Sequence, residues 1–296
     1  MELQARQDGD PLLGTSTIST GASFGSSGRR KLSEETPAHG TIVIKIGGST
    51  LGGHDTTLED LVTLQRQGIN SVVVHGGGKV ISEWMVRQGI RPRFVRGLRV
   101  TDPASLEIVV AVLTGLVNKS LVASISALGG KAMGISGADG GMLQAKIQDP
   151  ELGLVGKVVG VNREPIDAVL NAGSIPVIAP VSVSFSEPSV GGATLLNVNA
   201  DTAAGEIAAA LGADRLVFLT DVEGVLDSSR RLIPRLTARQ ARGLMRSNVV
   251  AGGMVPKLEA CLTALQRKGV AQIMDGRKSH ALLETLSGKT LGTRVG

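Results

Sequence analysis

The sequence has almost no aromatic side chains. Phe, Trp and Tyr together make up 2% of its 296 residues, and Tyr is absent. Proteins that bind RNA or single-stranded DNA usually stack bases on aromatic rings, so this composition argues against such a role. The net charge of +5 is dispersed, and the longest basic run is Arg29-Arg30-Lys31. We therefore favour a mildly basic enzyme with an anionic substrate over a nucleic-acid-binding protein.

Cysteine is nearly absent as well. Cys261 is the only one, which excludes an intrachain disulfide and agrees with the reducing cytoplasm. It lies at helical spacing among Leu258, Leu262 and Leu265, which indicates a core residue rather than a nucleophile. No uninterrupted apolar run approaches the ~20 residues of a membrane span. We expect a cytoplasmic protein that binds neither membrane nor nucleic acid.

Residues 1–39 differ in composition from the rest of the chain. From Thr15 to Ser27 they are almost entirely Ser, Thr, Gly and Ala. Such a segment buries too little apolar surface to offset the entropy of ordering, so we predict a disordered extension. Acidic residues such as Glu2, Asp8 and Glu34 argue against an organelle transit peptide. The folded domain is expected to span residues 40–296.

From Thr41 onward, short apolar runs alternate with helical patterns. Strands are predicted over 41–46, 71–75, 131–135, 175–178, 215–220 and 272–275. Helices are predicted over 58–67, 102–128, 165–170, 200–211 and 254–267, and residues 142–161 have the pattern of a β-hairpin. This alternation is typical of an α/β protein with a mostly parallel sheet covered by helices on both faces. Ligands of such sheets bind at the carboxyl ends of the strands.

Two glycine-rich turns follow the first two predicted strands. One runs from Lys45 to Ser49 and the other from His75 to Gly78. Each places bare backbone N–H groups where a helix begins, an arrangement that binds anions, and Lys45 adds a positive charge. One such turn could be purely structural, but two on adjacent strands favour a phosphate site. Neither turn has the Walker A or dinucleotide-binding pattern, and His75 is expected to be structural.

Two later segments carry further polar residues. Arg99, within Gly97–Thr101, could clamp a carboxylate in a bidentate contact, and a surface salt bridge is an equal alternative. Alternation along an extended segment places Asn197 and Asn199 on one side. Asn199 and Asp201 fit a helix N-cap followed by an acidic first turn. Asn197 has no such explanation.

Together with Asp221–Leu226 and Gly252–Lys257, these segments resemble the amino-acid kinase family in their order and spacing. The resemblance covers about residues 40–296 and is strongest to members that phosphorylate N-acetyl-L-glutamate. It implies a three-layer αβα sandwich with a mostly parallel central sheet. The N-terminal half would bind the acyl amino acid and make a dimer contact, and the C-terminal half would bind ATP. Lys79-Val80 stands where many relatives have Pro-Gln.

The resemblance implies a role for each matching residue. Lys45 and Lys257 would be catalytic and stabilise the transferring phosphoryl group, while Asp201 would orient both lysines. The substrate-binding residues would be Gly77, Gly78, Arg99, Asn197 and Asn199. The nucleotide-binding residues would be Gly47, Gly48, Asp221, Gly224, Leu226 and Gly253. The resemblance implies no protein metal ligand, because Mg²⁺ would arrive with ATP and stay on phosphates and water.

The implied reaction is ATP-dependent phosphorylation of the γ-carboxylate of N-acetyl-L-glutamate to N-acetyl-L-glutamyl 5-phosphate, in arginine biosynthesis. This carboxyl group has a pKa near ~4.3, so it needs no general base. A kinase of another acidic amino acid or of a carrier-bound aminoadipate is the nearest alternative. A non-catalytic effector-binding protein is a second, although a binder needs neither lysine. Inhibition by arginine stays open, and a homodimer is favoured over a hexamer because the N-terminal region lacks an amphipathic helix.

Overall fold

The computed structural model describes residues 40–47, 56–184, 194–267 and 269–296. They belong to one compact unit, Ala38–Gly296. The predicted disordered extension and Gly48 lie outside the described residues.

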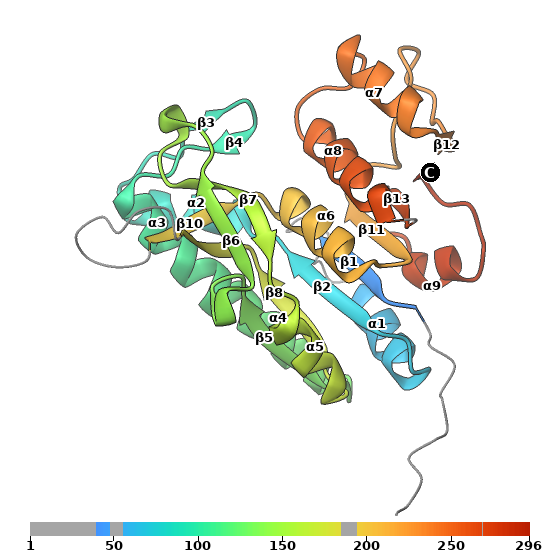
Figure 1. The fold of residues 1–296 in the computed structure, drawn as a ribbon, viewed down its shortest axis with the longest axis horizontal. Coiled ribbons are helices and arrows are strands. Elements are labelled where there is room, and N and C mark those ends of the chain that lie inside the picture. Colours follow the sequence, from blue (N-terminus) through green and yellow to red (C-terminus); the bar gives the residue numbers. More distant parts are fainter. Residues whose placement is uncertain (1–39, 48–55, 185–193, 268) are drawn as a thin grey trace, which may run out of the picture. The chain divides into compact units, whose positions relative to one another are not determined.

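An eight-stranded sheet forms the middle layer (Figure 1). Its strand order is β12-β14-β13-β11-β1-β2-β8-β5, and all neighbouring pairs are parallel except β13 with β14. The buried runs of Val and Ile in β1, β2 and β8 are those expected of strands covered on both faces. The strands are β1 (Ile42–Ile46), β2 (Ser71–His75), β5 (Ala132–Ser136), β8 (Ile175–Ala179), β11 (Arg215–Thr220), β12 (Arg235–Leu236), β13 (Val270–Asp275) and β14 (Thr293–Val295).

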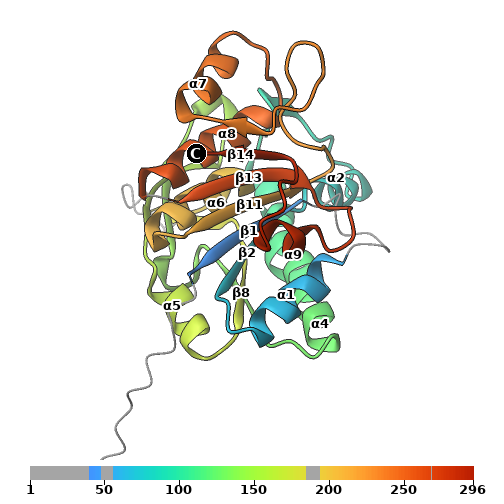
Figure 2. The ribbon, with the colours of Figure 1, turned by 90° about the vertical axis from the view of Figure 1, so that its right-hand side faces the viewer.

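Helices cover both faces of this sheet (Figure 2). One face carries α5 (Glu164–Asn171), α6 (Ala200–Leu211) and α8 (Met254–Ala264), and the other carries α1 (Thr57–Arg66), α4 (Asn118–Ala127) and α9 (Ala281–Leu286). Because successive side chains of a strand point to opposite faces, Val43 packs with α6 and α8 while its neighbours Ile42 and Ile44 pack with α1 and α4. The predicted three-layer αβα sandwich is therefore confirmed.

Smaller β-elements surround the carboxyl ends of the central strands. A closed sheet contains β6 (Leu143–Ile147), β7 (Val155–Val161), β9 (Val181–Ser184) and β10 (Thr194–Val198). The antiparallel pair β6–β7 is the hairpin predicted over 142–161. A separate hairpin pairs β3 (Phe94–Val95) with β4 (Leu98–Arg99), just after α2 (Gly78–Arg87).

The long helix predicted from Asp102 is present but is not uniform. The Asp102 side chain caps α3 (Pro103–Val110) by accepting a hydrogen bond from the Ser105 N–H at 2.7 Å. The chain then continues as a π-helix, Ala111–Val117, before α4 begins. No feature of the sequence predicted this wide turn, and π-helical segments often lie at functional sites.

By length and composition this helix, Pro103–Ala127, is also apolar enough to cross a membrane, with a mean hydropathy of 1.9. Polar residues such as Thr114 and Lys119 interrupt the apolar stretch, so this helix contains no uninterrupted apolar run of that length although its average hydropathy is high. Side chains including Val109 and Val112 pack in the protein core. Length and composition alone are weak evidence for a span, since core helices of soluble proteins share them.

Candidate active site

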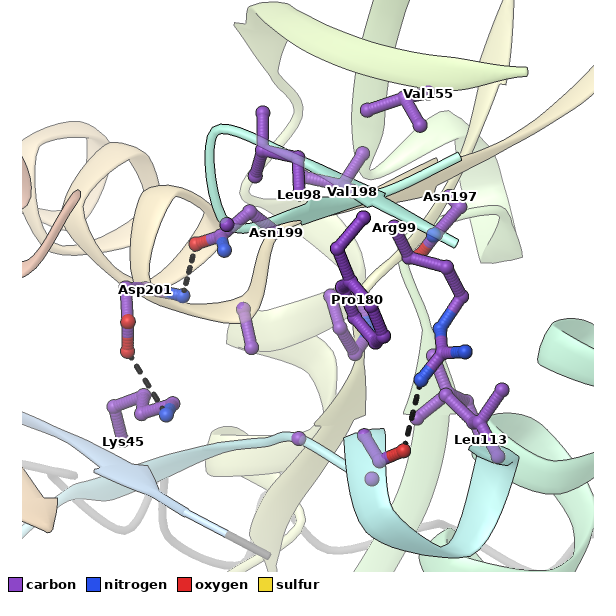
Figure 3. Close-up of a pocket in the computed structure, with 17 residues that line it drawn as sticks. Lys45, Leu98, Arg99, Leu113, Val155, Pro180, Asn197, Val198, Asn199 and Asp201 are labelled. Carbon is purple, nitrogen blue, oxygen red and sulfur yellow. Dashed lines mark hydrogen bonds and ion pairs between the residues drawn. The ribbon is translucent and has the colours of Figure 1, made fainter. Parts of the chain in front are cut away.

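A cavity of about 230 Å³ lies where the carboxyl ends of β1 and β2 approach β10 and the β3–β4 hairpin (Figure 3). Figure 3 shows Lys45 and Asp201 at one end, Arg99 at the other, and Pro180 between them. The predicted catalytic and substrate-binding residues, Lys257 excepted, all line this cavity: Lys45, Gly77, Gly78, Arg99, Asn197, Asn199 and Asp201. Tertiary structure thus gathers segments that lie far apart in the sequence.

Asp201 holds two lysine side chains together. Lys45 Nζ lies 2.9 Å from Asp201 Oδ1, and Lys257 Nζ lies 2.8 Å from Oδ2. The three side chains are nearly buried, with exposed fractions of 10%, 13% and 7% for Lys45, Lys257 and Asp201. Burial by itself raises the pKa of Asp201, but the two ammonium groups outweigh it and hold this pKa below its ordinary value. Two positive charges share one negative charge, so this end of the cavity favours an anion.

Local structure explains why these side chains meet. Asn199 Oδ1 accepts hydrogen bonds from the N–H groups of Asp201 at 2.9 Å and Thr202 at 3.1 Å, which confirms the predicted N-cap and fixes Asp201 in the first turn of α6. Lys257 lies in the first turn of α8. The two helices pack closely at Gly205, where an added Cβ would be 2.8 Å from the Ala260 Cα. This close packing brings the two helix N-termini to the same place.

Arg99 is a buried cation that contacts only neutral groups among the described residues. Its side chain donates hydrogen bonds to the Gly78 carbonyl oxygen and to Ser82 Oγ, both at 2.8 Å, and lies 4.7 Å from the ring centroid of Phe94. Arg99 is 7% exposed, and burial lowers the pKa of its guanidinium. The alternative of a surface salt bridge was therefore wrong. These neutral partners and Met85 Sδ accept from three of the five guanidinium N–H groups and leave the charge uncompensated, which suits an anionic ligand.

Thr101 connects the two segments that were predicted to bind substrate, a role that sequence reasoning missed. Asn197 Nδ2 donates to Thr101 Oγ1 at 3.0 Å, and the Thr101 hydroxyl donates to the Arg99 carbonyl oxygen at 2.9 Å. This contact explains Asn197, which the N-cap interpretation did not. The sequence did contain a signal for this role, because Thr101 is the last residue of the Gly97–Thr101 segment. Apolar cavity residues such as Pro180 carried no chemical signal.

Predicted nucleotide-binding residues follow the neighbouring strands rather than lining the cavity. The Gly47 N–H donates to the Leu219 carbonyl oxygen at 3.2 Å, directly after β1. Asp221 is exposed after β11, and Gly253 is the N-cap residue of α8. Because β1 and β11 are parallel neighbours, these residues lie along the same edge of the sheet as Lys45.

Gly224 and Leu226 occupy the turn after β11. Gly224 has φ +154°, and an added Cβ would lie 2.7 Å from Thr293 Oγ1, so packing alone requires glycine there. Leu226 is 37% exposed and forms an isolated bridge with Leu232. These contacts explain the glycine structurally, and a role with a nucleotide stays a prediction for both residues.

The described residues offer no ready-made metal centre. No cluster of three or more His, Cys, Asp or Glu side chains occurs in this part of the chain. Both carboxylate oxygens of Asp201 already face lysines. The donor set therefore does not fit a metal held by the protein alone.

The fold and the site place the chain in a known class. The model of the amino acid kinase family matches residues 40–274, and the chain belongs to this family. It is 45% identical over 254 residues to the acetylglutamate kinase of Dehalococcoides mccartyi, covering 86% of this chain and 93% of that protein. It is 47% identical over 267 residues to the acetylglutamate kinase of Caldanaerobacter subterraneus, covering 86% and 87%.

Solved structures show the same architecture. The N-acetylglutamate synthase from Neisseria gonorrhoeae, complexed with coenzyme A and N-acetyl-glutamate, superposes with a TM-score of 0.75 at 25% sequence identity. The match covers 87% of this chain and 59% of that one.

Proposed function

We propose that this protein transfers the γ-phosphoryl group of ATP to the γ-carboxylate of N-acetyl-L-glutamate, giving N-acetyl-L-glutamyl 5-phosphate for arginine biosynthesis. The observation that carries the proposal is the buried Lys45–Asp201–Lys257 cluster, whose Lys45 and Asp201 line one end of the cavity, opposite the uncompensated charge of Arg99. The acetylglutamate kinases that resemble the chain at 45% and 47% identity support the same substrate.

The reaction needs positioning and charge stabilisation more than proton transfer. The γ-carboxylate, with a pKa near ~4.3, is already ionised at neutral pH and attacks without a base. Negative charge then moves through a loose transition state onto the equatorial and leaving oxygens. Lys45 and Lys257 meet this charge, and Asp201 holds both ammonium groups in place. Because these dipoles and charges are fixed before the reaction, they lower its barrier.

The acid substrate lies between the two charged ends of the cavity. Arg99 binds the carboxylate that does not react, and Asn197 and Asn199 contact the acyl amino acid. Gly77 and Gly78 line the same space at the start of α2, where backbone N–H groups favour an anion. In this proposal Gly77, Gly78 and Arg99 come from the N-terminal half of the domain, and Asn197 and Asn199 join them from beyond its midpoint.

ATP lies across the edge formed by the C-terminal half. In this proposal Gly47 and Gly48 contact its phosphates, and Asp221, Gly224, Leu226 and Gly253 surround the rest of the nucleotide. Mg²⁺ arrives with ATP and is held by phosphate oxygens and water, a coordination that this ion accepts.

A coupled assay of ADP release tests the substrate. We expect turnover with N-acetyl-L-glutamate and far less with L-glutamate or L-aspartate, and hydroxylamine should trap the acyl phosphate product. Turnover confined to another acid, including a carrier-bound aminoadipate, would show a different kinase. Binding of acetylglutamate without ADP release would show a non-catalytic effector-binding protein.

We also propose a homodimer formed through the N-terminal half. Leu116 is 44% exposed and Met133 is 46% exposed, and Met133 lies on β5, the edge strand of the sheet. Apolar side chains beside an open strand edge favour association. Light scattering should give twice the chain mass of 30.4 kDa, and Met133→Glu should shift it towards the monomer. A hexamer mass would refute the dimer.

The proposed compartment is the cytoplasm, which suits a chain with one cysteine. Fractionation of the source cells tests this, and recovery of the protein from an organelle would refute it.

A further inference from the structure

A buried histidine and asparagine adjoin the glycine loop of the cavity. His75 ends β2 and is 0% exposed, as is Asn118 at the start of α4. His75 Nδ1 lies 3.1 Å from the Gly76 carbonyl oxygen, and His75 Nε2 lies 3.1 Å from Asn118 Nδ2. Neither side chain has a place in the reaction derived above. The prediction that His75 is structural does not say which part of the protein this side chain holds in place.

The partners allow only one protonation state of the imidazole. A carbonyl oxygen can only accept, so Nδ1 carries the proton and donates it to Gly76. Asn118 Nδ2 also donates to the Val177 carbonyl oxygen at 2.8 Å, and Asn118 Oδ1 accepts from Lys119 Nζ at 3.0 Å. The amide orientation is thus fixed, and Nε2 must accept. Burial agrees with a neutral ring, because it lowers the pKa of His75 to about 4.

The π-helix brings Asn118 to this position. The wide turn of a π-helix changes the direction in which the following side chains project from the helix axis. Asn118 comes directly after the π-helix Ala111–Val117. Gly134 leaves room for the amide, since an added Cβ would lie 1.9 Å from Asn118 Oδ1. The same π-helix supplies Leu113, whose Cδ2 would lie 2.8 Å from a Cβ on Gly77. One helix segment therefore supports the loop from two sides.

The hydrogen bonds of Gly76 determine the direction of the next N–H group in the loop. The Gly76 N–H donates to the Ile46 carbonyl oxygen at 3.1 Å, and His75 holds the Gly76 carbonyl oxygen. In a trans peptide the N–H of the next residue points opposite to that carbonyl. The Gly77 N–H is therefore aimed away from His75, and it has no acceptor among the described residues. Gly77 lines the cavity.

We infer that His75 and Asn118 are positioning residues, which hold the Gly76–Gly77 peptide so that the Gly77 N–H faces the anionic substrate. This rests on the proposed function for the identity of the substrate. A fixed N–H stabilises charge that develops during transfer, whereas a free peptide must first be reoriented. The network acts through the loop and does not touch the reacting atoms.

Three substitutions at His75 in the full chain test this inference. In His75→Asn the amide lies where Nδ1 was and can still donate to Gly76. In His75→Gln it lies nearer the Nε2 position and cannot. We expect His75→Leu and His75→Gln to lower kcat at least tenfold with an unchanged KM for ATP, while His75→Asn keeps most of the activity. Wild-type kcat in folded His75→Leu, or no advantage of Asn over Gln, would overturn the inference.

Nitrogen-15 NMR of the imidazole tests the network without any substrate. We expect the Nδ1–H form between about pH 6 and 8, where an ordinary histidine titrates. In Asn118→Asp acceptors face both ring nitrogens, so Nε2 should gain a proton while Nδ1 keeps its own, and the ring should become charged at a higher pH than in the wild type. An Nε2–H or charged ring in the wild type would refute the network. If the wild type fails to phosphorylate acetylglutamate, the proposed function fails, and the NMR spectrum still decides this inference.

Discussion

In the proposed reaction, Lys257 faces charge that develops only during transfer. It lies 2.8 Å from Asp201 Oδ2 at the N-terminal turn of α8. Lys257→Ala should lower kcat by roughly a hundredfold or more, the usual effect of losing one electrostatic stabiliser. The KM for acetylglutamate should change little. Lys146→Ala, at an exposed position on β6, is the matched control and should keep wild-type kinetics. Near-normal kcat in a folded Lys257→Ala would contradict this role.

Arg99 should contribute to binding rather than to the chemical step. In the proposed complex it contacts a carboxylate whose charge is the same in the ground and transition states, so its loss removes uniform binding. Arg99→Ala should chiefly raise the KM for the acid, with a smaller effect on kcat. Steady-state kinetics with varied acetylglutamate measure this, and circular dichroism confirms folding. If Arg99→Ala abolished kcat while KM stayed constant, the assignment would be wrong.

At the scale of elements, the contact of α6 with α8 sets the geometry of the lysine cluster. A Cβ on Gly205 would lie 2.8 Å from the Ala260 Cα, a backbone atom that cannot move alone. Gly205→Ala should cost about 1–3 kcal/mol of unfolding free energy through overpacking and should lower kcat, because Lys257 moves away from Asp201. Urea unfolding and kinetics measure the two effects.

Gly243 provides the matched control for that substitution. It lies within α7 (Ala238–Arg246), where an added Cβ would meet no atom within 4 Å. Gly243→Ala should stabilise the protein by up to about 1 kcal/mol and leave kcat unchanged. Equal changes in unfolding free energy and kcat in Gly205→Ala and Gly243→Ala would show that helix propensity, and not the contact of α6 with α8, causes them.

The packing of α9 on α1 should depend on pH. His280 Nδ1 lies 2.7 Å from Oδ1 of the buried Asp60, and this partner raises the pKa of His280 above its ordinary value. A raised folded pKa contributes stability that is fully present below about 6.5 and is lost as pH rises through the folded pKa. Urea unfolding from acidic to alkaline pH should show this loss in the wild type. His280→Gln should not show it, and an identical profile would exclude the ion pair as its cause.

At the scale of the whole molecule, the N-terminal extension should be dispensable for catalysis. Residues 15–27 offer little apolar surface to pack, and the family match begins at residue 40. Deletion of residues 1–38 should leave kcat and KM within a factor of a few, measured in the coupled assay. A loss above about tenfold in soluble truncated protein would show that the extension contributes to the active domain.

The elements with strong periodic patterns were predictable. The helix over 200–211, the strand over 215–220 and the strand over 71–75 have the bounds expected from apolar runs and caps. Short or weakly apolar elements were missed, including α7, α9, β12 and β14. The helix α7 is amphipathic with a strongly polar outer face, and β12 has only two residues, Arg235–Leu236. Tertiary packing stabilises such elements more than their own sequence does.

The sequence by itself determined the alternation of strands and helices and the residue types at the strand ends, because apolar period and backbone propensity are local properties. It also supplied the family resemblance. Only the tertiary structure decided that Asp201 bridges Lys45 and Lys257 and that Arg99 is buried without a carboxylate partner among the described residues. It alone revealed the π-helix that brings Asn118 to His75. Those contacts join residues far apart in the chain, and their geometry follows from how helices pack on the sheet.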